Sequence, residues 1–589
     1  MNCMSEKFEN VLNLALETPR EERLQTEDLD VGFDDRTGRW ELIVKYNGSL
    51  EALLEAGIGV EYLIAGYALL DVPEELVSLV DSFPGIEYVE KPKQYFYADP
   101  GPADRNACIT GITAREPFLR GKDVLIAVLD SGIDYRNPVF LDSEGRTRIL
   151  ALWDQSIQTE DAPPPEGFQT GAEYTSERID AALQAASEAE GYAIVPSRDV
   201  SGHGTAVAGI AAGYAPGVYR GVATEAKLLI VKLGTTGRGG FPGTTQIMRG
   251  VTYALGVASK YQMPLVINLS FGNTYGPHNG TSLMERFLDN AAEIGRTVIC
   301  VGSGNEGDNG GHVSGNVLQR NAVELAVANY ENSLSVQLWK SFQDNYRVRI
   351  RNPSGTSIVL NPEVEQGKYT LQLGRTRLLV YFGDPTPYSV LQELYVEMIP
   401  LDTYLESGVW EFRMEPGRIV TGEYAMYLPS GSVRNSGTSF LQPTSDATMT
   451  IPSTSQRVIT VGAYDPVFDA YASFSGRGFE TGRSLAVDAN RQKPDLVADG
   501  VDVLAPSVTG GFVQVTGTSF SAPIVSGSAA LLMEWGIVRG NDVFLYGEKM
   551  KAFLRRGALP LRGEERYPNE KTGFGRLCPA AGLFGFGPV

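Results

Sequence analysis

The 589-residue sequence is poor in the side chains that build disulfide frameworks and metal sites, with only four cysteines and three histidines. Cys3, Cys108, Cys300 and Cys578 are scattered without the spacing of metal ligands. We therefore interpret them as free thiols, and Cys300 as a small core residue within an apolar strand. This pattern is consistent with synthesis in a reducing compartment, and it predicts neither a metal site nor a cofactor.

Long apolar runs and an excess of positive charge are also missing. No apolar run reaches the roughly 18 residues of a membrane-spanning helix. The N-terminus contains acidic side chains and no apolar core of a secretory signal. The formal net charge of −21 would repel nucleic-acid phosphates. We expect a monomer made in the cytoplasm, with neither a nucleic acid nor a membrane as its partner.

What the sequence does contain fits a loop-rich globular protein of several units. Hydrophobic residues make up 43% of the chain, and 33 prolines and 66 glycines divide it into many short segments. Because 589 residues exceed one ordinary domain, the length predicts about three or four units.

One short motif is typical of a nucleophile at the start of a buried helix: Gly517-Thr518-Ser519-Phe520-Ser521-Ala522-Pro523. Proline is favoured in the first turn of a helix, and a run of small and apolar residues follows it. The helix dipole and the free backbone N–H groups there favour developing negative charge. Ser519 is therefore the candidate nucleophile, and it needs a base and a third group to orient that base.

The candidate base is found among the three histidines. His203 stands in a stretch of glycine and alanine, residues 202–209, where a helix can begin in a tightly packed interior and direct the imidazole into a cleft. His278 is interpreted as part of a surface turn, and His312 follows two glycines in a predicted loop. On its flanks alone, His203 is equally well explained as a core or capping histidine. The pairing with Ser519 favours catalysis.

The candidate orienting carboxylate is Asp130, which follows six apolar residues at 124–129. Such a run is typical of a strand buried on both faces of a parallel sheet. The carboxyl ends of these strands carry the sites of open α/β sheets. The alternative is an aspartate that only caps the following turn, and Asp134 fits that role better.

The segments Val-Leu-Asp-Ser-Gly-Ile, Gly-His-Gly-Thr and Gly-Thr-Ser-Phe-Ser-Ala-Pro, in this order, resemble the three active-site signatures of the subtilisin-like serine proteases, or subtilases. The resemblance implies an α/β fold, with a parallel sheet flanked by helices, and peptide-bond hydrolysis by Asp130, His203 and Ser519. A fourth segment, residues 298–307, resembles the family's strand and loop that carry the oxyanion-hole asparagine, here Asn305.

The resemblance also implies two segments that hold a peptide substrate between them through backbone hydrogen bonds. The predicted contacts are Gly237, Arg238 and Gly239 in a glycine-rich edge strand, Ser270, Phe271 and Gly272 at the end of another strand, and Gly304 beside the oxyanion asparagine. The expected partner is thus a protein or peptide. Apart from the resemblance, each glycine stretch is an ordinary turn.

Residues 1–97 form a predicted α+β domain of ferredoxin-like, βαβαβ order. Its strands are expected at 40–46, within 61–71 and at 86–89, and its helices at 49–56 and 73–82. This order resembles the subtilase propeptide, whose C-terminal tail occupies the active-site cleft. The resemblance implies that the chain's own prodomain is a partner of the cleft and that self-cleavage falls between about residues 93 and 98. The alternative is an unrelated interaction domain.

The remaining chain is predicted to be one catalytic domain, residues 98–319 and 447–589, interrupted by an insertion at 320–446. Helices are expected at 176–190, on the surface, and at 542–556. The insertion has short alternating strands at 334–339, 346–350, 368–373, 378–382, 393–399 and 408–414, which is typical of a β-sandwich or jelly roll. We favour a bracing role over partner binding, because no aromatic or basic cluster marks a site.

The combination of an acidic chain, an N-terminal prodomain and a β insertion resembles the clostridial spore-germination (Csp) subtilases and their relatives. It implies limited processing of a partner protein, such as a cortex-hydrolase zymogen, and an association with spores. The alternative from another class is a catalytically silent scaffold or binding protein that its own prodomain keeps occupied.

Overall fold

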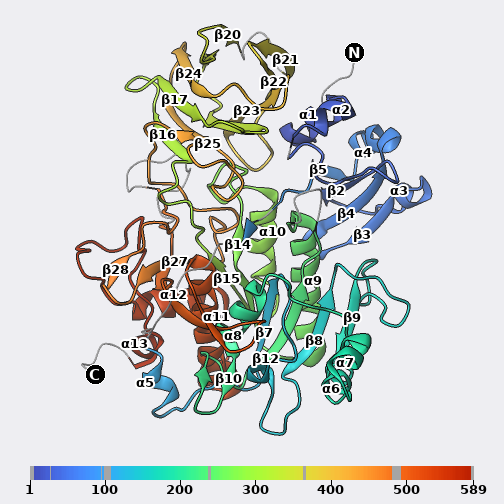
Figure 1. Ribbon diagram of the computed structural model, residues 1–589, viewed down its shortest axis with the longest axis vertical. Helices are drawn as coiled ribbons and strands as arrows, with labels where there is room; N and C mark the ends of the chain where they lie inside the picture. The colour runs from blue at the N-terminus through green and yellow to red at the C-terminus, as the bar shows by residue number, and fades with distance from the viewer. Residues whose placement is uncertain are drawn as a thin grey trace.

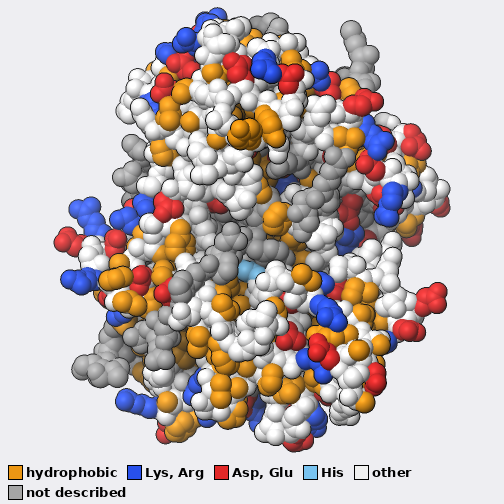
Figure 2. Space-filling model, viewed as in Figure 1, with side chains coloured by type: hydrophobic (Ala, Val, Ile, Leu, Met, Phe, Trp, Pro, Cys, Tyr) orange, Lys and Arg blue, Asp and Glu red, His pale blue; other side chains and the backbone are white. Residues whose placement is uncertain are grey.

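The computed structural model describes residues 5–26, 28–94, 108–235, 241–361, 367–479 and 492–584, and the backbone of residues 96–97. Figure 1 shows an N-terminal region on the right, a large region with a central sheet below, and an all-β region at the top. Figure 2 shows acidic and basic side chains interspersed over the N-terminal and all-β regions. On this face the acidic excess of the sequence is therefore not gathered into one patch.

A nine-stranded sheet forms the centre of the large region, in the order β28-β27-β15-β13-β7-β12-β8-β9, with β29 paired to β27. The pairs are parallel except for β9 and β28, which run antiparallel to their neighbours. The α/β class is confirmed, although the sheet is mixed, because short antiparallel strands lie at its edges. The strands are β7 (Leu125–Asp130), β8 (Ile149–Asp154), β9 (Ala172–Thr175), β12 (Lys227–Lys232), β13 (Leu265–Leu269), β15 (Thr297–Gly302), β27 (Ile459–Asp465), β28 (Ala470–Tyr471) and β29 (Leu496–Asp499).

Both faces of this sheet are buried, as the apolar run before Asp130 predicts. On β7, Ile126 and Val128 belong to one apolar cluster, whereas Leu125 and Leu129 belong to another on the opposite face. Several helices contribute to the first cluster, and two of the helices on each face bear on the site. They are α8 (His203–Ala212) and α11 (Thr518–Met533) on the first face, and α9 (Thr244–Tyr261) and α10 (Leu283–Ala291) on the second.

Helix α11 is buried around its whole circumference, consists mainly of small and apolar residues, and continues into a π-helical turn, Glu534–Val538. By length and composition, the helix Thr518–Val538 would be able to cross a membrane, but 89% of its most apolar window is buried inside the molecule. A helix that is apolar on all sides is expected in the interior of a large domain. The sheet and α8 therefore account for its composition.

Two surface helices differ from the prediction. The single helix predicted at 176–190 is two helices in the structure, α6 (Ser176–Leu183) and α7 (Glu188–Ile194). The Ser187 hydroxyl caps α7 by accepting the N–H of Glu190 at 3.3 Å, which starts a new helix. The helix expected from residue 542 begins only at Gly547. The remaining elements are α5 (Thr110–Thr113), α12 (Gly547–Gly557), α13 (Pro579–Phe584), β10 (Tyr214–Ala215), β11 (Tyr219–Arg220), β30 (Val503–Pro506) and β31 (Phe512–Val515).

The N-terminal region is an antiparallel sheet of order β1-β2-β4-β3, with β5 paired to β2. The single strand expected within 61–71 is wrong, because a turn with Ala65 at φ 56° and Gly66 at φ 72° divides the segment into two paired strands. The elements are α1 (Asn10–Glu17), α2 (Arg20–Arg23), β1 (Phe33–Asp34), β2 (Arg39–Tyr46), α3 (Glu51–Glu55), β3 (Gly59–Tyr62), β4 (Tyr67–Pro73), α4 (Val77–Ser82) and β5 (Ile86–Glu90).

The all-β region consists of two antiparallel sheets whose inward-facing side chains form one apolar cluster. Their orders are β16-β25-β18-β23-β22-β21 and β20-β19-β24-β17-β26. All six predicted strands are present; the boundaries at 320 and 446 and the jelly-roll topology stay predictions. The strands are β16 (His312–Asn316), β17 (Ala322–Val327), β18 (Leu334–Ser341), β19 (Tyr346–Arg351), β20 (Ser357–Leu360), β21 (Gly367–Leu373), β22 (Thr376–Phe382), β23 (Leu391–Pro400), β24 (Gly408–Pro416), β25 (Glu423–Tyr427) and β26 (Ser439–Phe440).

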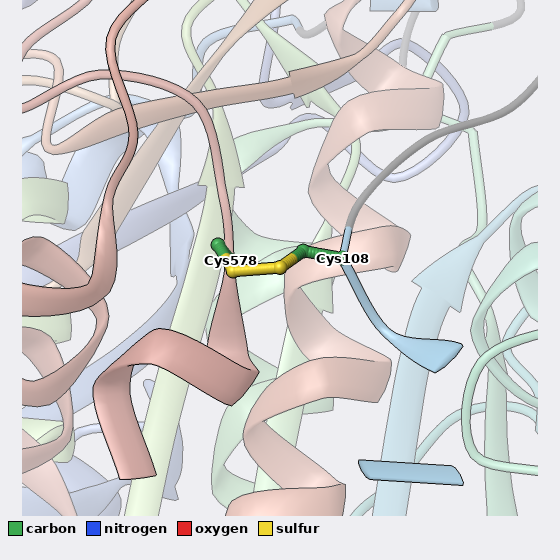
Figure 3. The surroundings of a disulfide bond; sticks show 2 residues. All are labelled: Cys108 and Cys578. Carbon is green, nitrogen blue, oxygen red and sulfur yellow. A yellow bond between two sulfur atoms is a disulfide. The ribbon is translucent and has the colours of Figure 1, made fainter. Parts of the chain in front are cut away.

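A disulfide joins Cys108 to Cys578 across 470 positions of the sequence (Figure 3). The interpretation of these two residues as free thiols is therefore wrong. Their spacing carries no signal, since the segments before α5 and α13 meet only in the folded chain. Cys300 is a free, buried thiol in β15, as predicted. Cys3 lies outside the described residues.

Candidate active site

Asp130 and His203 form the first half of the site. Asp130 is the last residue of the central strand β7 and is fully buried, and His203 is the first residue of α8. The His203 Nδ1 lies 2.7 Å from the Asp130 Oδ1. The same carboxylate oxygen accepts the backbone N–H of Ser131 at 2.7 Å. The carboxylate thereby orients the imidazole ring, as the sequence predicts.

A second buried carboxylate, Asp199, holds the start of α8 in place. One of its oxygens accepts the N–H of Gly202 at 2.9 Å and the hydroxyl of Ser131 at 2.8 Å. The other accepts the N–H and the hydroxyl of Thr205, at 2.8 and 2.7 Å. Asp199 therefore caps the helix and ties it to the residue after Asp130. The sequence analysis missed this role, although an aspartate shortly before a helix start is a recognisable cap signal.

Ser519 lies in the first turn of α11, after Gly517, whose φ of 140° and ψ of 159° favour glycine. Its hydroxyl donates to the backbone oxygen of Ser270 at 2.7 Å. The next residue, Phe520, packs with its ring centre 5.2 Å from that of His203. The fold thus brings the start of α11 against the start of α8, and in this arrangement the Ser519 proton is directed at the backbone oxygen of Ser270, which links β13 to β14.

Asn305 follows β15 and contacts the residue before Ser519. Its Oδ1 accepts both the N–H and the hydroxyl of Thr518, each at 3.1 Å. Gly304, at φ 91°, donates its own N–H to the Thr518 hydroxyl oxygen at 3.0 Å. Because its oxygen is engaged on one side, the Asn305 side chain presents its Nδ2 group, a hydrogen-bond donor, on the other.

Ser519 and Asn305 both line a cavity of about 390 Å³. The predicted residues Ser270, Phe271, Gly272 and Gly304 lie in its wall as well. Glu306, Ser430 and Gly431 also line the cavity but were not predicted from the sequence; the Glu306 carboxylate accepts the Ser430 hydroxyl at 2.6 Å and the Gly431 N–H at 3.1 Å. A loop of the all-β region, between β25 and β26, therefore helps to shape the cavity. It carries no motif that would reveal this.

The end of the N-terminal region pairs with a strand, β14 (Phe271–Gly272), whose residues line the same cavity. The backbone of β6 (Phe96–Tyr97) pairs antiparallel with β14 (Phe271–Gly272). Further back, the oxygen of Gln94 accepts the side-chain N–H of Asn273 at 3.1 Å, and Gln94 bridges to Gly243. A peptide segment is thus held on two sides by backbone pairing. The other predicted substrate segment, Gly237, Arg238 and Gly239, lies outside the described residues.

The predictions for the other two histidines are wrong: His278 is buried and not in a surface turn, and His312 begins strand β16 instead of lying in a loop. His278 is 1% exposed and His312 is 3% exposed. Both stack on Tyr427 of β25, with ring centres 3.8 and 4.6 Å away. Burial lowers the pKa of each imidazole to about 4. They lie where the all-β region meets the large region, which local turn signals do not report.

Within the described part of the chain, no group of three or more His, Cys, Asp and Glu side chains is placed to hold a metal ion. The side chains gathered near the starts of α8 and α11 are a hydroxyl, an imidazole and a carboxylate, with the Asn305 amide beside them. This set suits acyl transfer.

Comparisons with known proteins agree with this chemistry. A model of the subtilase family matches residues 121–364 and 429–575, and a model of the Csp protease B prodomain matches residues 6–93. Among solved structures, the Clostridium perfringens CspB protease is 33% identical with a TM-score of 0.73, and the match covers 80% of this chain and 94% of that one.

Curated relatives match over shorter stretches. The major intracellular serine protease of Bacillus subtilis (strain 168) is 32% identical over 194 residues, which are 32% of this chain and 45% of that protein. Subtilisin-like protease SBT6.1 of Arabidopsis thaliana is 35% identical over 130 residues, 22% of this chain and 12% of that protein. The chain thus spans less than half of each of these relatives. Because the family model covers well over half of the sequence, the chain belongs to the subtilase family, and its N-terminal region is a prodomain of the Csp protease B type.

Proposed function

We propose that this protein is a serine endopeptidase that cuts the junction between its prodomain and its catalytic domain. One observation carries the proposal: the buried Asp130 carboxylate lies 2.7 Å from the His203 imidazole at the carboxyl edge of the sheet, where α11 presents Ser519 to a cavity. The prodomain tail pairs with β14, which lines the same cavity, and this tail is the first substrate.

In this mechanism His203 removes the Ser519 proton, and Asp130 orients the imidazole and stabilises its cation. The hydroxyl first turns from the Ser270 oxygen toward the imidazole, by rotation about the Cα–Cβ bond. The alkoxide attacks the peptide carbonyl, and Asn305 Nδ2 and the Ser519 N–H hold the resulting oxyanion. The imidazolium then protonates the leaving amine, and water hydrolyses the acyl-enzyme. Activity should therefore fall in mildly acidic solution.

The pairing of the tail refines the expected cut. Tyr97 pairs with Phe271, and Phe96 pairs with Gly272. If this antiparallel register continued by one residue, position 98 of the tail would face Ser270. Ser270 is in direct contact with Ser519. We therefore infer cleavage of the peptide bond after Ala98, at the end of the interval expected from the sequence. Ala98 itself lies outside the described residues.

The test is to express the full chain and its Ser519→Ala variant and to compare them on a denaturing gel and by mass spectrometry. The active chain releases a fragment of the prodomain's size, and the new N-terminus begins at Asp99. Ser528→Ala is a matched control, because Ser528 is also buried in α11 but donates only within the helix, to Ile524. Equal processing of the Ser519→Ala chain would contradict the proposal.

A second candidate function is binding without catalysis, and one observation favours it: the prodomain tail already occupies the strand edge while the Ser519 hydroxyl is bonded to Ser270. A fluorophosphonate probe separates the two functions, because it labels an activated serine. Labelling of Ser519 in the unaltered chain, and not in Ser519→Ala, supports the peptidase. Absence of both labelling and processing supports the binding protein.

We further propose that the natural substrate is one protein zymogen that acts in spore germination, and that the enzyme is associated with spores. The support is the match of residues 6–93 to the Csp protease B prodomain. In a test, the processed enzyme is offered a cortex-hydrolase zymogen and, in parallel, casein. A single cut in the zymogen with little digestion of casein is expected. Rapid digestion of casein would contradict the proposal.

A further inference from the structure

A polar residue lies in the middle of the most buried part of the sheet. Asn268 belongs to β13, whose other residues are leucine, isoleucine and valine, and its side chain is fully buried. By the alternation of the strand it shares a face with Val266, which belongs to the apolar cluster under α8 and α11. A buried amide in such a place is costly unless its hydrogen bonds are made.

The hydrogen bonds of Asn268 connect α11 to the strand that holds the peptide. Its Oδ1 accepts the hydroxyl of Ser526 at 2.8 Å. Its Nδ2 donates to the hydroxyl oxygen of Ser270 at 2.8 Å. Ser270 in turn donates its hydroxyl to the backbone oxygen of Ser519 at 2.8 Å. The three serines and the asparagine are all buried.

The amide decides where the Ser270 proton goes. A serine hydroxyl has one proton and accepts through its oxygen. Because the Asn268 Nδ2 is a donor, the Ser270 hydroxyl oxygen accepts from it. The Ser270 hydroxyl proton is then available to the backbone oxygen of Ser519. Ser270 and Ser519 are then joined by two hydrogen bonds. The Ser270 hydroxyl donates to the backbone oxygen of Ser519, and the Ser519 hydroxyl donates to the backbone oxygen of Ser270.

We propose that Asn268 is a positioning residue that fixes the distance between the substrate strand and the nucleophile. It acts through Ser270, which is both the last residue before β14 and the partner of the Ser519 backbone. Ser526, seven positions after Ser519 in the same helix, holds the other end of the amide. This inference rests on the proposed peptidase activity and assigns a role to residues that do not contact the reacting atoms themselves.

The decisive variants are Asn268→Asp and Ser270→Ala. Aspartate has the shape of asparagine but lacks the N–H donor. The Ser270 hydroxyl would then donate its proton to the carboxylate at position 268, and the hydrogen bond to the Ser519 backbone oxygen would be lost. Alanine at 270 removes the link directly. Misplacing a reacting group by about 1 Å can cost about 100-fold in rate. We therefore expect a loss of roughly 10- to 100-fold in kcat for each variant, with KM nearly unchanged.

The rate is measured in two ways on the full chain: cleavage of the prodomain junction, and turnover by the processed enzyme of a synthetic peptide with the sequence of residues 91–102. Because Asn268 acts through Ser270, the double variant should be no slower than the slower single variant. Ser526→Ala should show a smaller loss in the same direction. Ser528→Ala, whose hydroxyl bonds only to Ile524, should process and turn over at the rate of the unaltered chain.

Normal kcat in a folded Asn268→Asp chain would overturn the inference, as would losses that multiply in the double variant or appear only in KM. If Asn268→Asp does not fold, Ser270→Ala and Ser526→Ala decide, since normal kcat in both would overturn it equally. An unaltered chain that neither processes itself nor reacts with a fluorophosphonate would instead contradict the proposed function.

Discussion

The prodomain is held by two surfaces of different chemistry, one on the catalytic domain and one on the all-β region. The catalytic surface uses buried charge. Arg249 of α9 lies 2.6 Å from a Glu41 oxygen and 3.0 Å from a Glu61 oxygen, which come from neighbouring parts of the prodomain sheet. Burial raises the pKa of Glu61 even though the guanidinium opposes this effect.

The surface on the all-β region is mainly apolar. Helix α1 of the prodomain packs on β22 and β23, and the prodomain core continues without a break into Leu379, Tyr381, Tyr395 and Ile399. An ion pair between Arg377 and Glu22, at 3.0 Å, lies beside this core. The prodomain and the all-β region thus share one hydrophobic cluster, while the bracing role expected of the insertion stays a prediction.

The difference between the charged and the apolar surface shows how the prodomain can be bound tightly and also in one defined position on the catalytic domain. Apolar burial contributes free energy in proportion to area but is not directional. Arg249, with its planar fork of donors, accepts only one arrangement of the two carboxylates. The charged surface therefore determines the register of the prodomain, and with it the position of the tail, whereas the apolar surface contributes mainly affinity. The following experiments separate these contributions.

The largest effect is expected for Arg249→Ala, because it leaves the buried Glu61 and the partly buried Glu41 without their cation. Removing one partner of a buried ion pair typically costs about 3 to 5 kcal/mol. The measurement is the free energy of unfolding of the full chain in the Ser519→Ala background, by chemical denaturation. Arg249→Met combined with Glu41→Gln and Glu61→Gln should recover most of the loss. No recovery would mean that the charges themselves do not account for it.

The next effect is on pH. Burial, and then the charge of Glu9, raises the pKa of Glu393 to about 8, and burial raises that of Glu90 to about 7. When the prodomain is docked, Glu90 of the prodomain and Glu393 of the all-β region therefore stay protonated at a pH at which both would be ionised in water. Their contribution to docking is complete below the ordinary glutamate pKa and is lost as the pH rises, with each group lowering the docking constant by up to about tenfold per pH unit, Glu90 up to about pH 7 and Glu393 up to about pH 8.

Size-exclusion chromatography of the processed enzyme tests this pH dependence, with the retained prodomain measured near pH 5 and near pH 8. Less prodomain should be retained at the higher pH. Glu393→Gln, which also keeps the acceptor for Asn10, should flatten the curve. Retention that rises with pH over this interval would contradict the assignment.

A smaller effect is expected for Ile399→Val, which removes one methylene from the shared core. Such a change typically costs about 0.5 to 1.5 kcal/mol. Ile350→Val is the matched control, because Ile350 is equally buried but belongs to the interior of the all-β region. Limited proteolysis should show faster loss of the prodomain for Ile399→Val than for the control. Equal rates would mean that the shared core does not hold the prodomain.

The smallest effect is expected for Arg20→Ala. Arg20 pairs with Asp35 at 2.5 Å, and both side chains are largely exposed to solvent. Exposed pairs contribute little, so the free energy of unfolding should change by less than about 0.5 kcal/mol. A change as large as that of Arg249→Ala would show that position in the fold, and not burial of charge, governs these losses.

Much of the fold was predictable from local patterns. The run before Asp130 predicts a strand buried on both faces, and the six strands of the insertion follow from alternation and turn signals. Errors arose where a single turn changes the outcome, as at Ala65 and Gly66, where one predicted strand is two. Propensity over a window does not register one residue with a positive φ.

The candidate site was predicted in part for the same reason. Asp130 and His203 were singled out only in combination with Ser519, because the flanks of each also fit a structural role, and the structure brings the two into contact. Glu306, Ser430 and Asn268 were not singled out, because each acquires its role from a partner more than a hundred positions away. No periodicity or motif encodes such a contact.

The sequence by itself determined the residue types of the site, their order along the chain and the burial of the strand that presents Asp130, because strands, caps and helix starts depend on neighbouring residues. Only the tertiary structure decided that Cys108 meets Cys578, that His278 and His312 stack on one tyrosine, and that a buried amide joins Ser270 to α11. These contacts depend on how the sheet, its helices and the all-β region pack together, and close packing is a property of the whole chain.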